Sequence, residues 1–157
     1  MFDFLKKEKY MGAITDGSIL EIALVPDQVF SQKLLGDGFA IVPSADKFVS
    51  PVRGTVTDVT DTRHAYCITS DDGLEVLVHI GIDTVELKGE GFEALVKKGD
   101  RVETGTPIVK ADLKLIEGSG YNTTSMVVVT NMDRVRNLKV LENPSVKSGD
   151  KAIIYKV

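Results

Sequence analysis

Residues 64–80, HAYCITSDDGLEVLVHI, carry the strongest local structural signal in the chain. Two runs rich in β-branched and apolar residues flank the sequence DDG at 71–73, which favours a tight turn. These features predict a β-hairpin. His64 and His79, the only histidines in the chain, lie near the open ends of its two strands.

The register of this hairpin decides whether the two histidines meet. If residues 72–73 form a two-residue type I′ loop, His79 lies opposite Tyr66, and His64, Tyr66, Leu77 and His79 share one face. The two rings are then diagonal neighbours on backbones roughly 7 to 8 Å apart, close enough to touch. A three-residue loop would shift the pairing by one residue and place the rings on opposite faces.

Short β-branched runs, separated by Gly, Asp, Asn and Pro, continue on both sides of the hairpin and predict many short strands. The expected strands are residues 19–24, 39–42, 55–59, 65–69, 74–80, 108–111, 126–130, 138–141 and 152–155. Helical spacing is rare. Phe92, Leu95 and Val96 predict two turns of helix before Gly99, and Asn131 is expected to cap a second short turn. We therefore expect an all-β fold, an antiparallel sandwich or barrel-like arrangement with one or two short helical turns.

Two pairs of segments echo one another. Residues 96–100 and 146–150 share the pattern VKxGD, and residues 17–22 and 54–59 are both Gly-led apolar runs. The echoes fit a duplicated β unit, and they fit equally the turns and strands that recur in any Gly-rich β protein.

The chain has 157 residues, 43% hydrophobic and 27% charged, as expected for one globular domain with a substantial core. We assign residues 13–157 to this domain and residues 1–12 to a flexible N-terminal lead. Lys and Arg number 19 against 23 Asp and Glu, a net charge of −4, which argues against nucleic acid as a partner. The longest apolar run, residues 126–129, is far too short for a stable membrane span, and the N-terminus lacks the order of a signal peptide. With Cys67 as its single cysteine, the sequence predicts a cytoplasmic protein.

Two facing imidazoles are suited to phosphoryl chemistry. Their like charges disfavour double protonation in a partly desolvated site, so at least one ring stays neutral and nucleophilic. A neutral ring can attack phosphorus while the other donates a hydrogen bond to the phosphoryl oxygens. Two alternatives stay open: a half-buried contact without function, or a pair of zinc ligands, for which Asp83 is the obvious third.

Residues 75–92, EVLVHIGIDTVELKGEGF, closely resemble the signature of the glucose-type IIA proteins of the bacterial phosphoenolpyruvate-dependent sugar phosphotransferase system. Six further segments resemble the same family in the same order, residues 25–31, 36–41, 50–54, 62–65, 99–102 and 130–133. The resemblance covers nearly the whole chain beyond about residue 13, and it implies a compact β-sandwich.

The resemblance implies a phosphocarrier that accepts a phosphoryl group from the histidine phosphocarrier protein HPr and passes it to a cysteine on a IIB domain of a sugar permease. It makes His79 the phosphorylated residue, at Nε2, and His64 the residue that stabilises the phosphate. It further implies that the backbone carbonyl of Gly81 holds the Nδ1–H of His79, which fixes the tautomer, and that Thr62 orients His64.

The resemblance also implies a docking surface for partner proteins, with an apolar part and acidic residues that meet partner arginines. The residues expected on it are Val29, Phe30, Leu34, Leu35, Asp27 and Asp83. The sequence departs from many family members at Thr60 and Leu77, where an aromatic residue is common. This departure predicts a difference in partner affinity or choice.

We expect no cofactor to be required, and only weak zinc binding by His64 and His79, with zinc a candidate at a partner interface. A zinc peptidase of the lysostaphin type shares the HxGxD element at residues 79–83 but needs further histidines. A biotinyl or lipoyl carrier would need an acceptor-lysine motif that the sequence lacks. A regulatory role, in which the unphosphorylated protein binds transporters or kinases, is compatible with phosphotransfer.

Overall fold

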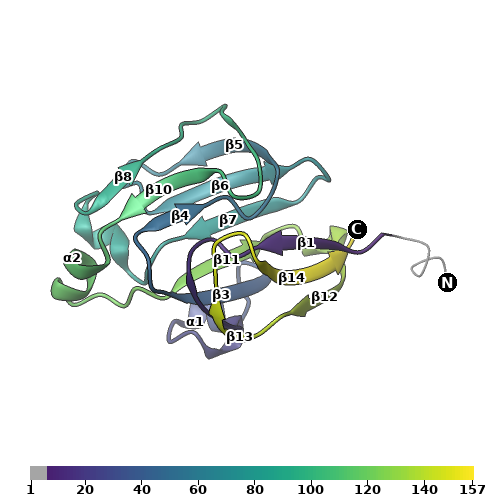
Figure 1. Cartoon of the computed structure of the whole chain (residues 1–157), viewed down its shortest axis with the longest axis horizontal. Helices are drawn as coiled ribbons and strands as arrows, with labels where there is room; N and C mark the ends of the chain where they lie inside the picture. Colours follow the sequence, from purple (N-terminus) through teal and green to yellow (C-terminus); the bar gives the residue numbers. More distant parts are fainter. Residues whose placement is uncertain (1–6) are drawn as a thin grey trace.

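The predicted hairpin lies within an eight-stranded antiparallel sheet, the largest sheet in the computed structural model, which describes residues 7–157 (Figure 1). In spatial order, its strands are β13 (Asn143–Val146), β2 (Gly17–Glu21), β3 (Asp37–Pro43), β11 (Ser125–Val129), β7 (Glu75–His79), β6 (Ala65–Ser70), β5 (Gly54–Val59) and β9 (Arg101–Val102). One three-stranded sheet contains β4 (Lys47–Val49), β10 (Pro107–Ala111) and β8 (Phe92–Ala94). The other contains β1 (Lys9–Gly12), β14 (Lys151–Lys156) and β12 (Arg136–Val140).

Helical segments are short. Among residues 7–157, the α-helices are α1 (Gln28–Ser31) and α2 (Leu113–Gly118), and the 3₁₀ turns are η2 (Ile22–Leu24), η3 (Thr84–Leu87) and η4 (Met132–Arg134). The expected all-β antiparallel class with short helical turns is therefore confirmed. Figure 1 shows α1 and α2 at separate places on the molecule, with α1 beside the large sheet near β3.

Apolar side chains cover the large sheet on both faces near its centre. All five residues of β11 are buried, as a continuous apolar run requires when neither face meets water. Val127 and Val129 join the main core, which includes side chains from all three sheets. Met126 and Val128 point to the other face, where they join a smaller group that we call the outer cluster. Its buried members are Ile22, Val25, Phe30, Ala40, Ile82, Met126 and Val128.

Of the two loop lengths that the sequence left open, the hairpin has the three-residue loop. Ser70 N–H donates to Leu74 O at 2.9 Å, and Gly73 adopts a left-handed φ of 89°, as expected for a type I turn followed by a bulge residue. His79 consequently pairs with Ala65 rather than with Tyr66. The Ser70 side chain explains the choice, because its Oγ accepts from Leu74 N–H at 2.9 Å and closes the longer loop.

The shifted register changes which residues share the histidine face. Tyr66, expected beside the histidines, is fully buried in the main core on the opposite face. The histidines nevertheless meet, with ring centroids 4.9 Å apart. His64 lies just before β6 and follows Arg63, whose φ of 58° is left-handed. Strand alternation therefore does not govern the direction of the His64 side chain.

The helix expected from Phe92, Leu95 and Val96 is not formed, whereas the short helical turn expected after Asn131 is present as η4. Phe92, expected in a helix with Leu95 and Val96, lies in β8, where Phe92 pairs with Ala111 and the Leu95 N–H donates to Ile108 O at 2.8 Å. Two isolated helical turns are only marginally stable, so the available strand partner prevails. Asn131 does precede η4, but its side chain does not cap it. Asn131 Oδ1 instead accepts from Glu75 N–H at 2.8 Å, and so it braces β7.

The boundary that we expected between a flexible N-terminal lead and the domain, at residue 12, lies too far along the chain. Residues 9–12 form β1, which pairs with β14, and Met11 is fully buried in the main core. Residues 1–6 of the expected lead lie outside the described residues. Figure 1 shows β1 and β14 side by side. Among the described residues, no helix is long and apolar enough to cross a membrane.

The two VKxGD segments form the same turn. Asp100 accepts from Lys97 N–H at 3.0 Å, and Asp150 accepts from Lys147 N–H at 2.8 Å. Gly99 N–H donates to Val56 O and Gly149 N–H to Ala13 O, at 2.7 and 2.8 Å. The repeated pattern therefore encodes a turn that fastens a separate stretch of backbone.

Candidate functional site

The two imidazole rings lie edge to face at the open end of the hairpin. Their planes are inclined at 82°, and the Phe30 ring lies on another side of His79 with a centroid separation of 5.2 Å. His64 is buried and His79 is half-buried. The site therefore combines a shielded ring with one that stays accessible from outside.

The loop after β7 fixes the tautomer of His79. His79 Nδ1 lies 2.8 Å from the carbonyl oxygen of Gly81. Because a carbonyl oxygen only accepts hydrogen bonds, Nδ1 must carry the proton, and in the neutral ring Nε2 then holds the lone pair. His79 Nε2 has no hydrogen bond within residues 7–157.

Two threonine hydroxyls lie beside the Nδ1 of His64. Thr62 Oγ1 lies 2.7 Å from this atom, and Thr60 Oγ1 lies 3.4 Å from it. Thr60 Oγ1 also accepts from Ala65 N–H at 3.2 Å, so it stabilises the bend that leads into β6. The sequence reasoning singled out Thr62 for its contact with His64 but treated Thr60 only as a missing aromatic residue.

Burial favours the neutral form of both rings. Burial and, to a smaller extent, the charge of the neighbouring His79 ring lower the pKa of His64 from 6.5 to about 4. Burial also lowers the pKa of His79, although its hydrogen bond to Gly81 and the carboxylates of Asp27 and Asp83 oppose the shift. A neutral His79 can act as a nucleophile without first losing a proton.

The segment that follows η2 places acidic and apolar side chains next to His79. Asp27 caps α1, because its Oδ1 accepts from Val29 N–H at 2.9 Å. Val29, Leu34 and Leu35 are 44%, 67% and 41% exposed, unusually high values for apolar residues. Phe30 differs from them because it is buried in the outer cluster and contacts His79, so it supports this surface from below.

The exposed apolar residues that the sequence reasoning missed include Leu24 and Val85. Leu24 in η2 is 65% exposed, and Val85 in η3 is 46% exposed. Asp83 immediately precedes η3 with a left-handed φ of 60°. Leu77, one of the two residues at which the sequence departs from the resembled family, packs partly buried against the outer cluster.

The alternative of a zinc site has little structural support. Among residues 7–157, no group of three or more His, Cys, Asp or Glu side chains is arranged to hold a metal ion. His64 and His79 are close enough to supply two ligands, whereas zinc in proteins takes three or four. Asp83 does not complete a set with them.

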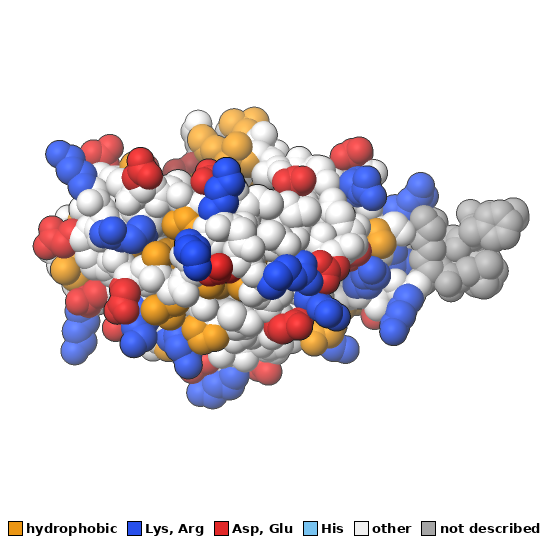
Figure 2. All heavy atoms as spheres, turned by 90° about the horizontal axis from the view of Figure 1, so that it is seen from above, with side chains coloured by type: hydrophobic (Ala, Val, Ile, Leu, Met, Phe, Trp, Pro, Cys, Tyr) orange, Lys and Arg blue, Asp and Glu red, His pale blue; other side chains and the backbone are white. Residues whose placement is uncertain are grey.

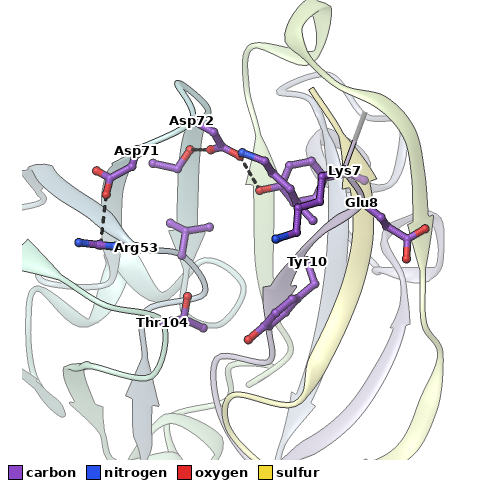
Figure 3. Close-up of a pocket in the computed structure, with 11 residues that line it drawn as sticks. Lys7, Glu8, Tyr10, Arg53, Asp71, Asp72 and Thr104 are labelled. Carbon is purple, nitrogen blue, oxygen red and sulfur yellow. Dashed lines mark hydrogen bonds and ion pairs between the residues drawn. The ribbon is translucent and has the colours of Figure 1, made fainter. Parts of the chain in front are cut away.

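A surface pocket of about 450 Å³ lies elsewhere, at the turn end of the hairpin (Figure 3). Its lining residues include Lys9, Tyr10, Arg53, Asp71, Asp72 and Tyr155, none of which the sequence predicted for the site. The histidine pair lies outside this pocket.

Comparisons with known proteins identify the family. A family model described as phosphoenolpyruvate-dependent sugar phosphotransferase system, EIIA 1, matches residues 9–135. The glucose-specific EIIA component of Staphylococcus aureus (strain N315) is 39% identical over 150 residues, which cover 96% of this chain and 90% of that protein. The glucose-specific EIICBA component of Staphylococcus carnosus (strain TM300) is 44% identical over 140 residues, 89% of this chain but only 21% of that larger protein.

The fold comparison agrees with the sequence comparison. The structure of glucose permease IIA from Mycoplasma capricolum superimposes with a TM-score of 0.88 at 37% identity, covering 96% of this chain and 97% of that one. The chain therefore belongs to the EIIA 1 family of the phosphoenolpyruvate-dependent sugar phosphotransferase system.

Proposed function

We propose that His79 Nε2 accepts a phosphoryl group from HPr and passes it to a cysteine on the IIB domain of a sugar permease. The chain is a phosphocarrier component of sugar uptake, as its family shows. The observation that carries the assignment of His79 is its hydrogen bond to the Gly81 carbonyl, which leaves Nε2 unprotonated.

The transfer needs no redox partner. In the first step, the lone pair of His79 Nε2 attacks phosphorus, and the bond between phosphorus and the donor histidine breaks, returning its electron pair to the donor ring. In the second step, a thiolate on the IIB domain attacks phosphorus, and the electron pair of the P–N bond returns to Nε2. The residue's own chemistry is therefore sufficient, and we propose that no cofactor takes part.

His64 supports the phosphoryl group in this proposal. With Thr62 Oγ1 donating to His64 Nδ1, the His64 proton resides on Nε2 and can be donated to a phosphoryl oxygen. The 4.9 Å separation of the ring centroids places such a donor beside a group bound to His79. Thr62 consequently acts as the residue that orients His64.

Cys67 does not compete for the phosphoryl group. Its strand places it on the same hairpin face as His79, opposite Leu77. Burial raises the pKa of the Cys67 thiol, and the nearby Asp58 and Glu75 raise it further. The thiol therefore stays protonated at neutral pH, and a protonated thiol is a poor nucleophile.

The docking surface comprises Val29, Leu34 and Leu35 with the carboxylates of Asp27 and Asp83, and Phe30 beneath it. We propose that it binds HPr and IIB in turn. Its apolar residues would be buried in the complex, and the acidic residues would attract a basic partner. Elsewhere on the molecule, Lys and Arg alternate with Asp and Glu on the face seen in Figure 2, a pattern that does not favour nucleic acid.

A cytoplasmic location follows from this proposed pair of partners. Zinc enters the proposal only at a partner interface, where His64 and His79 would supply two ligands and the partner the others. Binding of unphosphorylated protein to transporters or kinases would use the same docking surface.

Incubation with phosphoenolpyruvate, enzyme I and HPr tests the central proposal. Intact-mass measurement should find one added phosphoryl group, labile in acid and stable in alkali, as expected for phosphohistidine. Omitting HPr provides the control and should leave the mass unchanged. No added mass in the presence of active partners would end the phosphocarrier proposal for His79.

A further inference from the structure

The carbonyl of Gly81 is the only anchor of the His79 ring nitrogen Nδ1 within residues 7–157. Whatever orients Gly81 therefore sets the tautomer of the reactive ring. Gly81 has a left-handed φ of 75°, and a Cβ at this position would lie 2.5 Å from Thr84 Cγ2. The backbone at Gly81 thus needs support from its surroundings as well as the absence of a side chain.

The peptide unit that carries this carbonyl is held at both ends. Its oxygen accepts from His79 Nδ1–H, and its N–H, which belongs to Ile82, donates to Asn122 O at 2.9 Å. In a trans peptide, the two groups point in opposite directions. The bond to Asn122 O therefore turns the carbonyl toward His79.

The preceding peptide unit is held in the same manner, but by side chains. Gly81 N–H donates to Ser125 Oγ at 3.1 Å, and Thr84 Oγ1 donates to Ile80 O at 2.5 Å. Because Gly81 lies between these two peptide units, fixing both planes fixes its φ and ψ.

Ser125 is suited to this task by its own hydrogen bonds. It is fully buried, and its hydroxyl donates to Thr123 O at 2.9 Å. A hydroxyl has one proton to donate, so its lone pairs are left to accept from Gly81 N–H. Ser125 is also the first residue of β11, whose next residue, Met126, pairs with His79. A single strand thus positions both the backbone of His79 and the loop that anchors its ring.

We infer that Ser125 is a positioning residue, which holds the Gly81 carbonyl in place for His79 Nδ1 and so keeps Nε2 available as the nucleophile. The role of Nε2 as a nucleophile rests on the proposed function, whereas the orientation of the Gly81 carbonyl by Ser125 does not. Thr84 and Asn122 share the task, but Thr84 also packs against Gly81 and Asn122 contributes its backbone. Ser125 is therefore the member whose hydroxyl can be removed most cleanly.

The experiment measures the His79 tautomer directly in the unphosphorylated protein, by long-range ¹H–¹⁵N correlation spectra of the imidazole ring. In the wild type, we expect one protonated nitrogen, Nδ1, and one unprotonated nitrogen, Nε2. In Ser125→Ala, the two ¹⁵N shifts should move toward one another, because the other tautomer becomes populated. Phosphoryl uptake from phospho-HPr should slow roughly tenfold, as expected when a reacting atom is imperfectly held.

Three further variants distinguish the loss of the Ser125 positioning role from a general loss of structure. Ser125→Thr keeps the hydroxyl and should restore the wild-type shifts. Ser125→Cys, nearly isosteric but a weak acceptor, should move the shifts in the same direction as alanine but less far, and it serves if the alanine variant does not fold. Ser50→Ala is the matched control, since Ser50 is also fully buried and its Oγ also bonds to backbone, accepting from Val52 N–H at 3.4 Å and donating to Val52 O at 2.7 Å. It should leave the His79 shifts unchanged.

Wild-type His79 shifts in Ser125→Ala or, if that variant does not fold, in Ser125→Cys would overturn the inference, as would an equal change in Ser50→Ala. Failure of the wild type to accept a phosphoryl group, with the Nδ1–H tautomer intact, would instead reject the proposed function and leave the positioning role standing.

Discussion

The polar side chains at the two ends of the β6–β7 hairpin differ in how completely they are hydrogen-bonded. At the turn end, Asp72 accepts hydrogen bonds from Ser70 Oγ and, at 2.9 Å, from Tyr155 Oη, and its carboxylate lies 3.3 Å from Lys9 Nζ (Figure 3). At the open end, His79 is bound through Nδ1 alone, and its Nε2 makes no hydrogen bond to any described residue.

This difference separates stability from reactivity along one hairpin. Lys9 belongs to β1 and Tyr155 to β14, so the hydrogen bonds and ion pair of Asp72 link the β1–β14–β12 sheet to the eight-stranded sheet. A closed network of this kind stabilises the fold but offers no reactive atom. At the open end, only the ring nitrogen atoms that orient the two imidazoles are hydrogen-bonded. The lone pair of His79 Nε2 therefore remains available for reaction.

Replacing His79 should have the largest effect, because it removes the reactive atom. His79→Ala should abolish phosphoryl uptake from phospho-HPr, measured by intact mass. The thermal unfolding temperature should remain high enough for the variant to be folded under assay conditions, because Asp72 and its partners at the other end are untouched. A phosphorylated His79→Ala protein would show that the acceptor has been assigned to the wrong residue.

Replacing His64 should separate the two transfer steps. His64→Gln retains an amide donor for the phosphate, so uptake from HPr should survive. Transfer to IIB should slow by roughly 10²-fold, because a neutral amide stabilises the departing phosphoryl group less well. Rapid-mixing measurements of both steps provide the test, with His79→Ala as the negative control. Complete loss of uptake in His64→Gln would contradict this division of roles.

Breaking the network at the turn end should affect stability and spare reactivity. Asp72→Ala removes the acceptor of two hydroxyl groups and should lower the free energy of unfolding by about 2 kcal/mol. Chemical denaturation measures this loss. Asp71→Ala is the matched control, because Asp71 is exposed and pairs with Arg101 and Arg53 at the surface, so its loss should matter less. Equal losses in the two variants, or impaired phosphoryl uptake in either, would argue against the contrast between the two ends.

The pH dependence of stability should report the burial of His64. Its pKa is 6.5 in the unfolded chain and about 4 in the folded protein, so between these values the unfolded chain binds more protons. Stability should therefore fall as the pH is lowered from about 6.5 to 4, by on the order of 1 kcal/mol after allowance for solvent screening. The free energies of unfolding of the wild type and of His64→Gln, measured by chemical denaturation, should converge over this pH range. Because the carboxylates titrate in both proteins, the convergence reports His64 alone. Parallel dependences would mean that folding does not lower the pKa of His64.

The smallest effect is expected from charge at the rim of the open end. Asp27→Asn removes the charge but keeps an oxygen that can accept from Val29 N–H and cap α1. The association rate with HPr should fall by roughly a few-fold and should depend less on salt concentration. Exposed charges act mainly by attracting the partner over long range before contact. Stopped-flow binding at two ionic strengths measures both quantities, and Asp71→Asn at the far end is the control. An unchanged rate and salt dependence would place the docking surface elsewhere.

The sequence by itself determined the contacts that join near neighbours. Gly81 follows His79 by two residues and Thr62 precedes His64 by two, so each partner lies within reach of its ring wherever the rest of the chain packs. The alternation and spacing of β-branched residues similarly predicted the principal strands, because strand formation is encoded largely in short apolar runs bounded by turn residues.

Only the tertiary structure decided the rotation of His64 and the burial of Phe30. Asn131, 56 residues from Glu75, braces β7, and Ser125, 44 residues from Gly81, holds the loop that orients His79. Partners so distant in the chain become neighbours only after the sheets assemble. Local pattern therefore located the reactive residues, whereas long-range packing set the geometry in which they can react.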